Sequence, residues 1–192
     1  ELKRYFRYPP ISDLVVVHID AHTDTYRGDG NQDYMRFNVA TTFTRAAEEA
    51  LIDVESSIHV GARGPTNDSG VFNHTRDVGY GLIDSTELFN AGLRNTAKNI
   101  VESLKGRSVY LCFDMDFFDP SCAPGVCTPT WGGATSREGL DFLQNLSGLN
   151  LVGADINTVS PPHDISGMTA FLAATVGLEI LSVICHSKGL VE

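Results

Sequence analysis

The chain of 192 residues is long enough to bury one sizeable hydrophobic core. Hydrophobic residues make up 42% of it and charged residues 20%, a composition typical of globular proteins that excludes extensive disorder. The formal net charge of -10 disfavours nucleic acid and anionic membrane surfaces as partners, because both would be repelled. A metal ion or a small cationic substrate suits this charge better.

No apolar run reaches the roughly 20 residues of a membrane span, and the opening residues ELKRYFRYPP lack the apolar segment of a signal peptide. We therefore predict a cytoplasmic protein. The cysteines are too few and too irregularly spaced for a disulfide framework, and they are Cys112, Cys122, Cys127 and Cys185. Cys122 and Cys127 resemble half of a zinc site without a second half, so we predict reduced cysteines that serve in packing.

Along the chain, apolar runs predict strands and amphipathic or apolar patterns predict helices. The strands are expected at 13–20, 56–63, 79–84, 108–116 and 149–156, and the helices at 41–51, 85–106, 136–145 and 167–184. Ser85 and Ser136 are expected to start their helices, and the last helix, apolar almost all round, should be buried. This alternation predicts a three-layer α/β/α fold with a mainly parallel sheet, as a single domain over 1–192.

The stretch VVVHIDAHTDTY, residues 15–26, follows an apolar strand with alternating imidazole and carboxylate side chains. Residues i, i+2 and i+4 of an extended chain face the same side, so Asp20, His22 and Asp24 can converge on one point. Burying such groups is unfavourable unless something binds them. The first predicted strand therefore ends in a candidate ligand set.

Asp114 and Asp116 repeat the spacing after a second strand. The carboxyl ends of parallel strands lie at one edge of a sheet, where ligands bind. Either cluster alone is compatible with a solvated turn. Together they indicate a metal site, because neighbouring carboxylates cannot all stay ionised without cations. Oxygen ligands with one imidazole favour Mn²⁺ or a similar ion, and carboxylates can bridge two ions about 3.5 to 4 Å apart.

These residues resemble a known family. HIDAHTD, together with FDMDFFDPSCAPGVCTP followed by GG, is similar to the ureohydrolases, the arginase and agmatinase family, and VSPPHDISGMTAFLAATVGLEIL is similar to the agmatinase branch. The resemblance runs from about residue 15 to residue 181. It implies an arginase-like fold whose first strands lie upstream of this chain, which begins at Glu1, and it implies an oligomer with two Mn²⁺ ions per subunit.

By match to the family motifs, Asp20 and Asp114 would bridge both ions, His22 and Asp116 would bind one ion, and Asp24 would bind the other. A water between two such ions ionises near neutral pH. In the family the resulting hydroxide attacks the carbon of a small cationic guanidino substrate, and urea and an amine are released. Asp24 would be the catalytic residue, orienting the hydroxide and passing on its proton.

Three departures from the family pattern stand out. The family's sixth ligand, a His in a Gly-Gly-Asp-His segment, would lie upstream, and we interpret its absence as truncation. Val39, in NVATTF, stands where related enzymes carry a His that acts near the substrate. Thr158, in ADINTVSPP, stands where a Glu holds the guanidinium, and the adjacent Asn157 should face the other way.

We therefore predict an agmatinase-like amidinohydrolase, with two alternatives: a divergent enzyme acting on another amidino or formimino compound, or a non-catalytic metal-binding homologue. Thr158 and His163 are candidate substrate-binding residues. His18 is expected to be a hydrogen-bonded core residue behind the site, and Trp131 is expected to serve in packing. His59, with no acidic neighbour in the sequence, is given no role.

Overall fold

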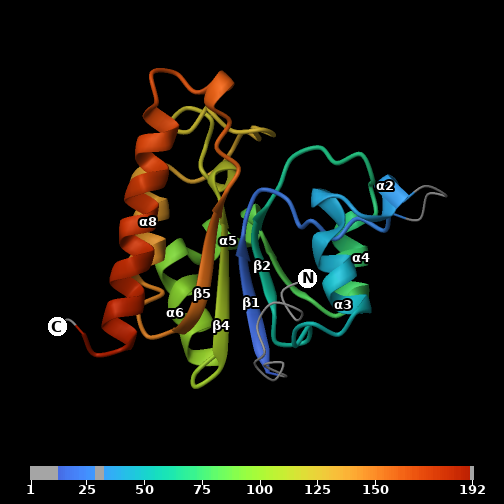
Figure 1. Cartoon of the computed structure of the whole chain (residues 1–192), viewed down its shortest axis with the longest axis horizontal. Helices are drawn as coiled ribbons and strands as arrows, with labels where there is room; N and C mark the ends of the chain where they lie inside the picture. Colours follow the sequence, from blue (N-terminus) through green and yellow to red (C-terminus); the bar gives the residue numbers. More distant parts are fainter. Residues whose placement is uncertain (1–12, 29–32, 191–192) are drawn as a thin grey trace.

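The computed structural model describes residues 13–28 and 33–190, and five parallel strands form its sheet (Figure 1). The strands are β1 (Leu14–Ile19), β2 (Ile58–Ala62), β3 (Gly81–Asp84), β4 (Ser108–Asp114) and β5 (Asn150–Asn157), in the spatial order β3-β2-β1-β4-β5. All neighbouring pairs are parallel. The five predicted strands and their parallel arrangement are confirmed.

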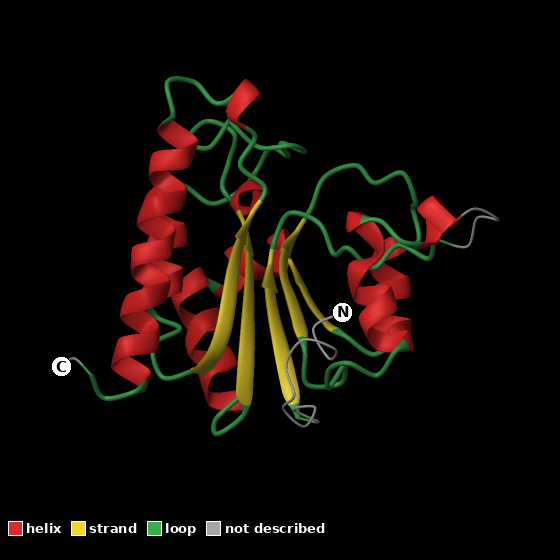
Figure 2. Ribbon diagram, viewed as in Figure 1, coloured by secondary structure: helices red, strands yellow, loops and turns green. Residues whose placement is uncertain are grey.

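Helices cover both faces of the sheet, which confirms the three-layer prediction (Figure 2). They are α2 (Asp33–Arg36), α3 (Thr42–Glu48), α4 (Val71–Val78), α5 (Ser85–Ala91), α6 (Leu93–Ser103), α7 (Ser136–Gln144) and α8 (Met168–Ser187). Short 3-10 turns η1 (Val39–Thr41), η2 (Met115–Phe117) and η3 (Pro161–His163) lie in the connections. The α3 and α4 helices lie on one face, and α6, α7 and α8 lie on the other.

The alternation of side chains along β1 builds a core on each face. Val15, Val17 and Ile19 belong to the larger core, which includes residues of α6, α7 and α8. Val16 faces the opposite way and packs in a smaller core with Phe43 and Tyr80. A strand buried on both faces reads as a continuous apolar run, which is why VVV marks this strand in the sequence.

The predicted helix 85–106 is two helices, because Gly92 adopts φ +83° between α5 and α6. The side chains that cap α5 and α7 are Asp84 and Thr135, one residue before the predicted Ser85 and Ser136. Each forms a capping box with a glutamate three residues later. The α4 helix was not predicted.

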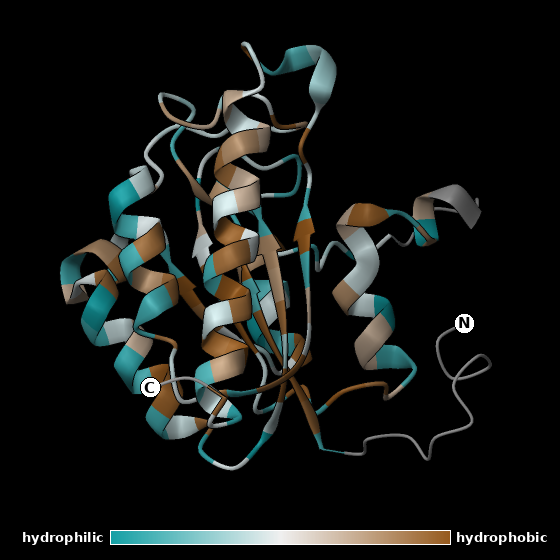
Figure 3. Cartoon of the chain, turned by 60° about the vertical axis from the view of Figure 1, so that its left-hand side comes forward, coloured by the Kyte–Doolittle hydropathy of each residue, from teal (hydrophilic) through white to brown (hydrophobic). Residues whose placement is uncertain are grey.

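The prediction that the last helix is buried is wrong. Val176 and Ile180 of α8 are buried, but Phe171 and Leu181 are 72% and 58% exposed. Figure 3 shows apolar residues on the outward side of this helix as well. The reason is that β5 is the edge strand of the described sheet, so α8 covers a sheet face with no further described strand beside it.

By length and composition α8 could also cross a membrane, contrary to the prediction that no apolar run is long enough. Core helices of soluble proteins pass the same test, so this property alone is weak evidence.

Two predictions about packing are also wrong. Trp131 is 74% exposed and Cys127 is exposed, because both lie in the long surface connection between β4 and α7. All four cysteines are free, and Cys112 is buried as predicted.

The strand order explains where a site can form. From β1 the chain proceeds to β2 and β3 on one side, whereas β4 lies on the other side of β1 and leads to β5. Connections that diverge from two adjacent parallel strands leave a crevice at their carboxyl ends. Asp20 directly follows β1 and Asp114 ends β4, so the fold places the two acidic motifs together at this point.

Candidate metal centre

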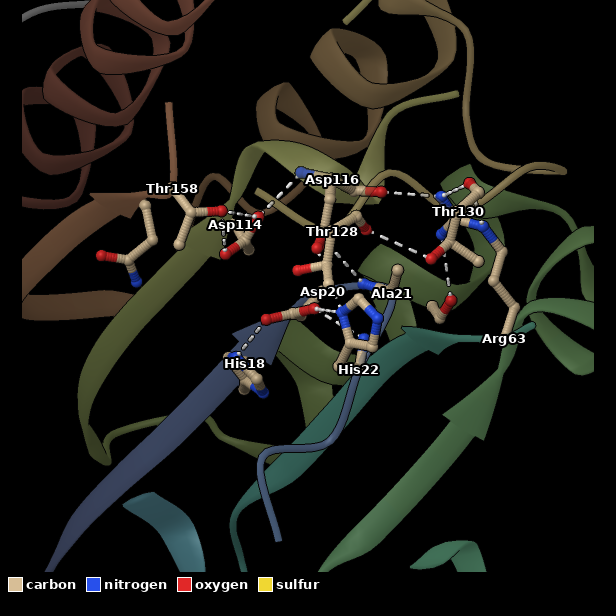
Figure 4. Close-up of polar contacts among 12 residues, drawn as sticks. His18, Asp20, Ala21, His22, Arg63, Asp114, Asp116, Thr128, Thr130 and Thr158 are labelled. Atoms are coloured by element: carbon tan, nitrogen blue, oxygen red, sulfur yellow. Dashed lines mark hydrogen bonds and ion pairs between the residues drawn. The ribbon is translucent and has the colours of Figure 1, made fainter. Parts of the chain in front are cut away.

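Asp20, His22 and Asp116 bring their polar atoms together above the ends of β1 and β4. His22 Nδ1 lies 3.2 Å from Asp20 Oδ1 and 3.0 Å from Asp116 Oδ2 (Figure 4). The backbone fixes this arrangement, because Ala21 N donates to Asp116 Oδ1 at 3.0 Å and His22 N donates to Asp20 Oδ1 at 2.6 Å. Asp20 and Asp116 are buried, so the group is a compact, desolvated set of ligand atoms.

A second group shares Asp20 with the first. Potential ligand atoms of His18, Asp20 and Asp24 all lie within 4.8 Å of one another. Asp24 adopts φ +50°, a conformation unusual for a non-glycine residue and one found often at functional sites. Thr23 and Thr25, on either side of Asp24, are buried, and their hydroxyl oxygens lie 2.7 Å apart.

Asp114 belongs to neither group by atom distance, but it adjoins them. Asp116 N donates to Asp114 Oδ1 at 2.8 Å, and the Thr158 hydroxyl lies 3.0 and 2.9 Å from the two carboxylate oxygens of Asp114. The amide of Asn157 turns away and donates to Asp155 Oδ1, as strand alternation predicts. Thr158 is therefore a hydrogen-bond donor to a candidate ligand.

Burial and like charges perturb the pKa values of the cluster. Burial, followed by the charge of Asp20, raises the pKa of Asp24 to about 7 and that of Asp114 to about 8. Hydrogen bonds that His22 donates to the carboxylates of Asp116 and Asp20 raise its pKa to about 10. Burial would also raise the pKa of Asp20, but His18 and His22 hold it below its ordinary value. The cluster therefore retains protons where isolated carboxyl groups would be ionised.

The donor set fits divalent cations. Atoms that bind one octahedral ion at right angles, at about 2.1 Å, lie about 3 Å apart. The distances from His22 Nδ1 to the oxygens of Asp20 and Asp116 match that spacing. Carboxylate oxygens with imidazole suit Mn²⁺ and similar ions, and bound cations would offset the repulsion among the carboxylates.

His163, a predicted substrate-binding residue, and Val39, a departure from the family pattern, lie outside the acidic cluster. His163 is exposed on η3, where its Nδ1 hydrogen-bonds with the Ser160 hydroxyl at 2.7 Å, and it is not part of the acidic cluster. Val39, at the position of the family His, is 81% exposed at the start of η1.

Arg63 is a contributor that the sequence interpretation missed. It follows β2, is 7% exposed, and its guanidinium donates to the backbone carbonyls of Asp116 at 2.7 Å and Thr130 at 2.8 Å. Figure 4 shows the side chain reaching across to the loop after β4. A charged residue directly after an apolar strand was the available signal, the same signal that marked Asp20.

His59 is the second missed residue. His18 is a buried, hydrogen-bonded residue as predicted, with Nε2 3.0 Å from Asp20 Oδ2. Its other ring nitrogen, Nδ1, lies 2.8 Å from Nδ1 of His59 on the adjacent strand. No sequence signal pointed to this contact, because the two residues are 41 positions apart.

Comparison with known proteins places this geometry in context. The chain is 35% identical over 172 residues to guanidinobutyrase of Pseudomonas aeruginosa, an alignment covering 88% of this chain and 52% of that protein. It is 38% identical over 175 residues to agmatinase of Photorhabdus laumondii, covering 91% and 53% respectively. The solved structure of proclavaminate amidino hydrolase from Streptomyces clavuligerus matches with a TM-score of 0.82 and 35% identity, covering 91% of this chain and 56% of that one.

The chain thus spans about half the length of the curated relatives it matches. A sequence profile described as the arginase family matches residues 3–182, nearly the whole chain. The fold, the paired acidic motifs and this match lead to one conclusion: the chain belongs to the arginase family.

Proposed function

We propose that this chain is the metal-binding part of a binuclear, manganese-dependent hydrolase that cleaves a C–N bond of a guanidino compound, releasing urea and an amine in the manner of an agmatinase. The observation that carries the proposal is the pair of ligand groups that share Asp20, one with His22 and Asp116 and the other with His18 and Asp24. Membership of the arginase family and the names of its relatives support the same reaction class.

In this proposal Asp20, His22 and Asp116 would hold one ion, Asp24 would bind the second, and Asp20 and Asp114 would contribute to both. When bound, the ions would supply an acidified water and polarise the reacting group. The backbone around these residues orients the ligand atoms. Hydrogen bonds from Ala21 N, His22 N and Asp116 N fix the carboxylate orientations before any ion arrives.

Asp24 is the proposed proton carrier. Its carboxyl group is partly buried, and its pKa, raised by burial to about 7, lies near neutral pH in the metal-free chain. Asp24 also lies within the second ligand group, close to where the proposed ions would be held. A carboxylate in that position can accept and pass on a proton of the reacting water.

Thr158 and Val39 are the two positions that concern substrate preference. The Thr158 hydroxyl is occupied by Asp114 and carries no charge, and Val39 is exposed and cannot transfer a proton. The substrate class is therefore set by what else surrounds the cluster, and a different amidino or formimino compound is the competing outcome. Assembly into an oligomer and a cytoplasmic location remain predictions.

The test is to load the protein with Mn²⁺, quantify the bound metal, and assay urea from a panel of guanidino compounds that includes 4-guanidinobutyrate and agmatine. The D24N variant is the matched control, because it keeps the size of the side chain and removes the carboxylate. We expect two ions per chain and urea release that D24N lowers by about 10²- to 10⁴-fold. Bound metal without urea from any compound would favour another substrate or a non-catalytic role, and a chain that binds no metal would refute the proposal.

A further inference from the structure

A row of buried polar groups continues from the candidate metal centre into the sheet. His18 on β1 and His59 on β2 are direct partners in the parallel register, and both are 1% exposed. Their Nδ1 atoms lie 2.8 Å apart, and His18 Nε2 lies 3.0 Å from Asp20 Oδ2. The order of contacts is therefore His59, His18, Asp20, and the row ends at the carboxylate that both ligand groups share.

The protons in this row can be assigned from the acceptors. An ionised carboxylate only accepts hydrogen bonds, so the nitrogen facing Asp20, His18 Nε2, must carry a proton. Two Nδ1 atoms at 2.8 Å share one proton, which lies on either His18 or His59. If the proton lies on His59, His18 is a neutral imidazole protonated at Nε2, and if it lies on His18, His18 is an imidazolium; in both cases His18 donates to Asp20. The contact with His59 gives the buried Nδ1 of His18 a hydrogen-bond partner in either state.

Aromatic rings hold the pair in place. The Phe43 ring lies 4.5 Å from the His18 ring and 5.0 Å from the His59 ring, and the Tyr80 ring lies 4.8 Å from His59. Tyr80 donates its hydroxyl to the carbonyl of Phe43 at 2.8 Å, so it does not compete for either imidazole. His59 Nε2 has no hydrogen-bond partner within the described part of the chain. A buried polar atom left unpaired is rare, and within the described part of the chain Nδ1, through His18, makes the hydrogen-bonding contact of this ring.

We propose that His18 and His59 are positioning residues for the metal centre: the His59–His18 pair donates a fixed hydrogen bond to Asp20 and thereby sets the orientation in which Asp20 binds metal. This inference rests on the metal centre of the proposed function. Partners that orient metal-ligating carboxylates commonly change metal affinity by about 10- to 100-fold when they are removed. Because Asp20 is shared by both ligand groups, its orientation affects both ions.

The experiment is a calorimetric titration of the metal-free full chain with Mn²⁺, comparing wild type with four variants. H18F keeps the ring and removes both nitrogens, whereas H18Q retains an N–H that can reach Asp20. H59F removes the nitrogen that pairs with His18 Nδ1. Y80F removes the hydroxyl of a ring in the same aromatic cluster and is the control for packing, and thermal melting reports the stability of each variant.

We expect H18F to weaken Mn²⁺ binding by about 10- to 100-fold, H18Q to recover most of that loss, and H59F to weaken binding to a smaller extent. Y80F should lower the melting temperature and leave the affinity unchanged. Unchanged affinity in H18F would overturn this inference alone. Complete loss of one of two ions in both H18F and H18Q would overturn it in favour of His18 as a ligand. A wild-type chain that binds no Mn²⁺ would overturn the proposed function as well.

Discussion

Thr158 shows how one hydroxyl group can define the chemistry of a site. Its side chain extends from the end of β5, and both oxygens of Asp114 lie within hydrogen-bond distance of the hydroxyl. A hydrogen bond to a charged group is stronger than one between neutral groups, and it lowers the pKa of the acceptor. In this chain the hydroxyl at this position contacts a proposed metal ligand.

Replacing Thr158 tests this assignment. T158V is nearly isosteric and removes only the donor, so it should weaken Mn²⁺ binding by about 1 kcal/mol or somewhat more, roughly five- to tenfold. T158S keeps the hydroxyl and should bind like wild type. The measurement is equilibrium dialysis against Mn²⁺ with metal analysis of the protein. Wild-type affinity in T158V would show that the contact with Asp114 does not orient the ligand.

The loops that carry the ligands are held by elements outside the metal centre. Arg63, after β2, is a buried cation whose partners are backbone carbonyls on the connection after β4, including those of Asp116, Phe118 and Thr130. Each such bond pairs a nitrogen of the buried guanidinium with a backbone carbonyl of that connection. The strand β2 therefore fixes the position of a ligand on the far side of β1.

Arg63 is accordingly expected to matter for stability as well as for metal binding. R63M should lower the free energy of unfolding by about 2–4 kcal/mol, because it leaves several carbonyls unpaired, and R63K should lower it less. Urea denaturation of the metal-free protein measures the change. R94M is the control, since Arg94 pairs with Asp141 on the surface and its loss should change stability little. Equal effects of R63M and R94M would contradict the role given to Arg63.

The molecule as a whole concentrates negative charge at one edge of its sheet. It carries a net charge of -10, and four of its aspartates gather at the switch point between β1 and β4. In the metal-free chain this cluster is stable only because it retains protons, as the raised pKa values of Asp24 and Asp114 indicate. The stability of the fold should therefore depend on pH in a direction set by these groups.

The direction in which stability changes with pH follows from proton binding. A carboxyl group whose pKa rises on folding, from 3.8 to about 7 in Asp24 and to about 8 in Asp114, binds more protons in the folded state between those values. Its contribution to stability is present below pH 3.8 and is lost as pH rises through the folded pKa. His22, raised from 6.5 to about 10, acts in the same direction at higher pH.

We therefore expect the melting temperature of the metal-free protein to fall between pH 5.5 and pH 8.5. Saturating Mn²⁺ should reverse that trend, because cations bind the deprotonated groups more tightly as pH rises. Melting curves with and without Mn²⁺ across this range measure both effects. A melting temperature that rises with pH in the absence of metal would contradict the raised pKa values.

Much of the fold and part of the site follow from local sequence pattern. The apolar run before Asp20 and the one that leads to Asp114 predicted two strands of one parallel sheet, because a buried strand requires apolar side chains on both faces. The alternate spacing of acidic residues predicted ligands that converge. The first residues of the helices were predicted to within one residue and their last residues to within three, whereas Gly92 divides a helix that was predicted to be continuous.

Contacts between distant parts of the chain could not be predicted from the local sequence pattern. The pairing of His18 with His59 depends on strand register, the Arg63 bonds depend on which loop follows the neighbouring strand, and the exposure of α8 depends on β5 lying at the edge of the described sheet. Local periodicity is determined by backbone geometry, so the sequence alone reveals it. Strand order, register and edge exposure arise only when the whole sheet has assembled, and they decide which buried polar groups find partners.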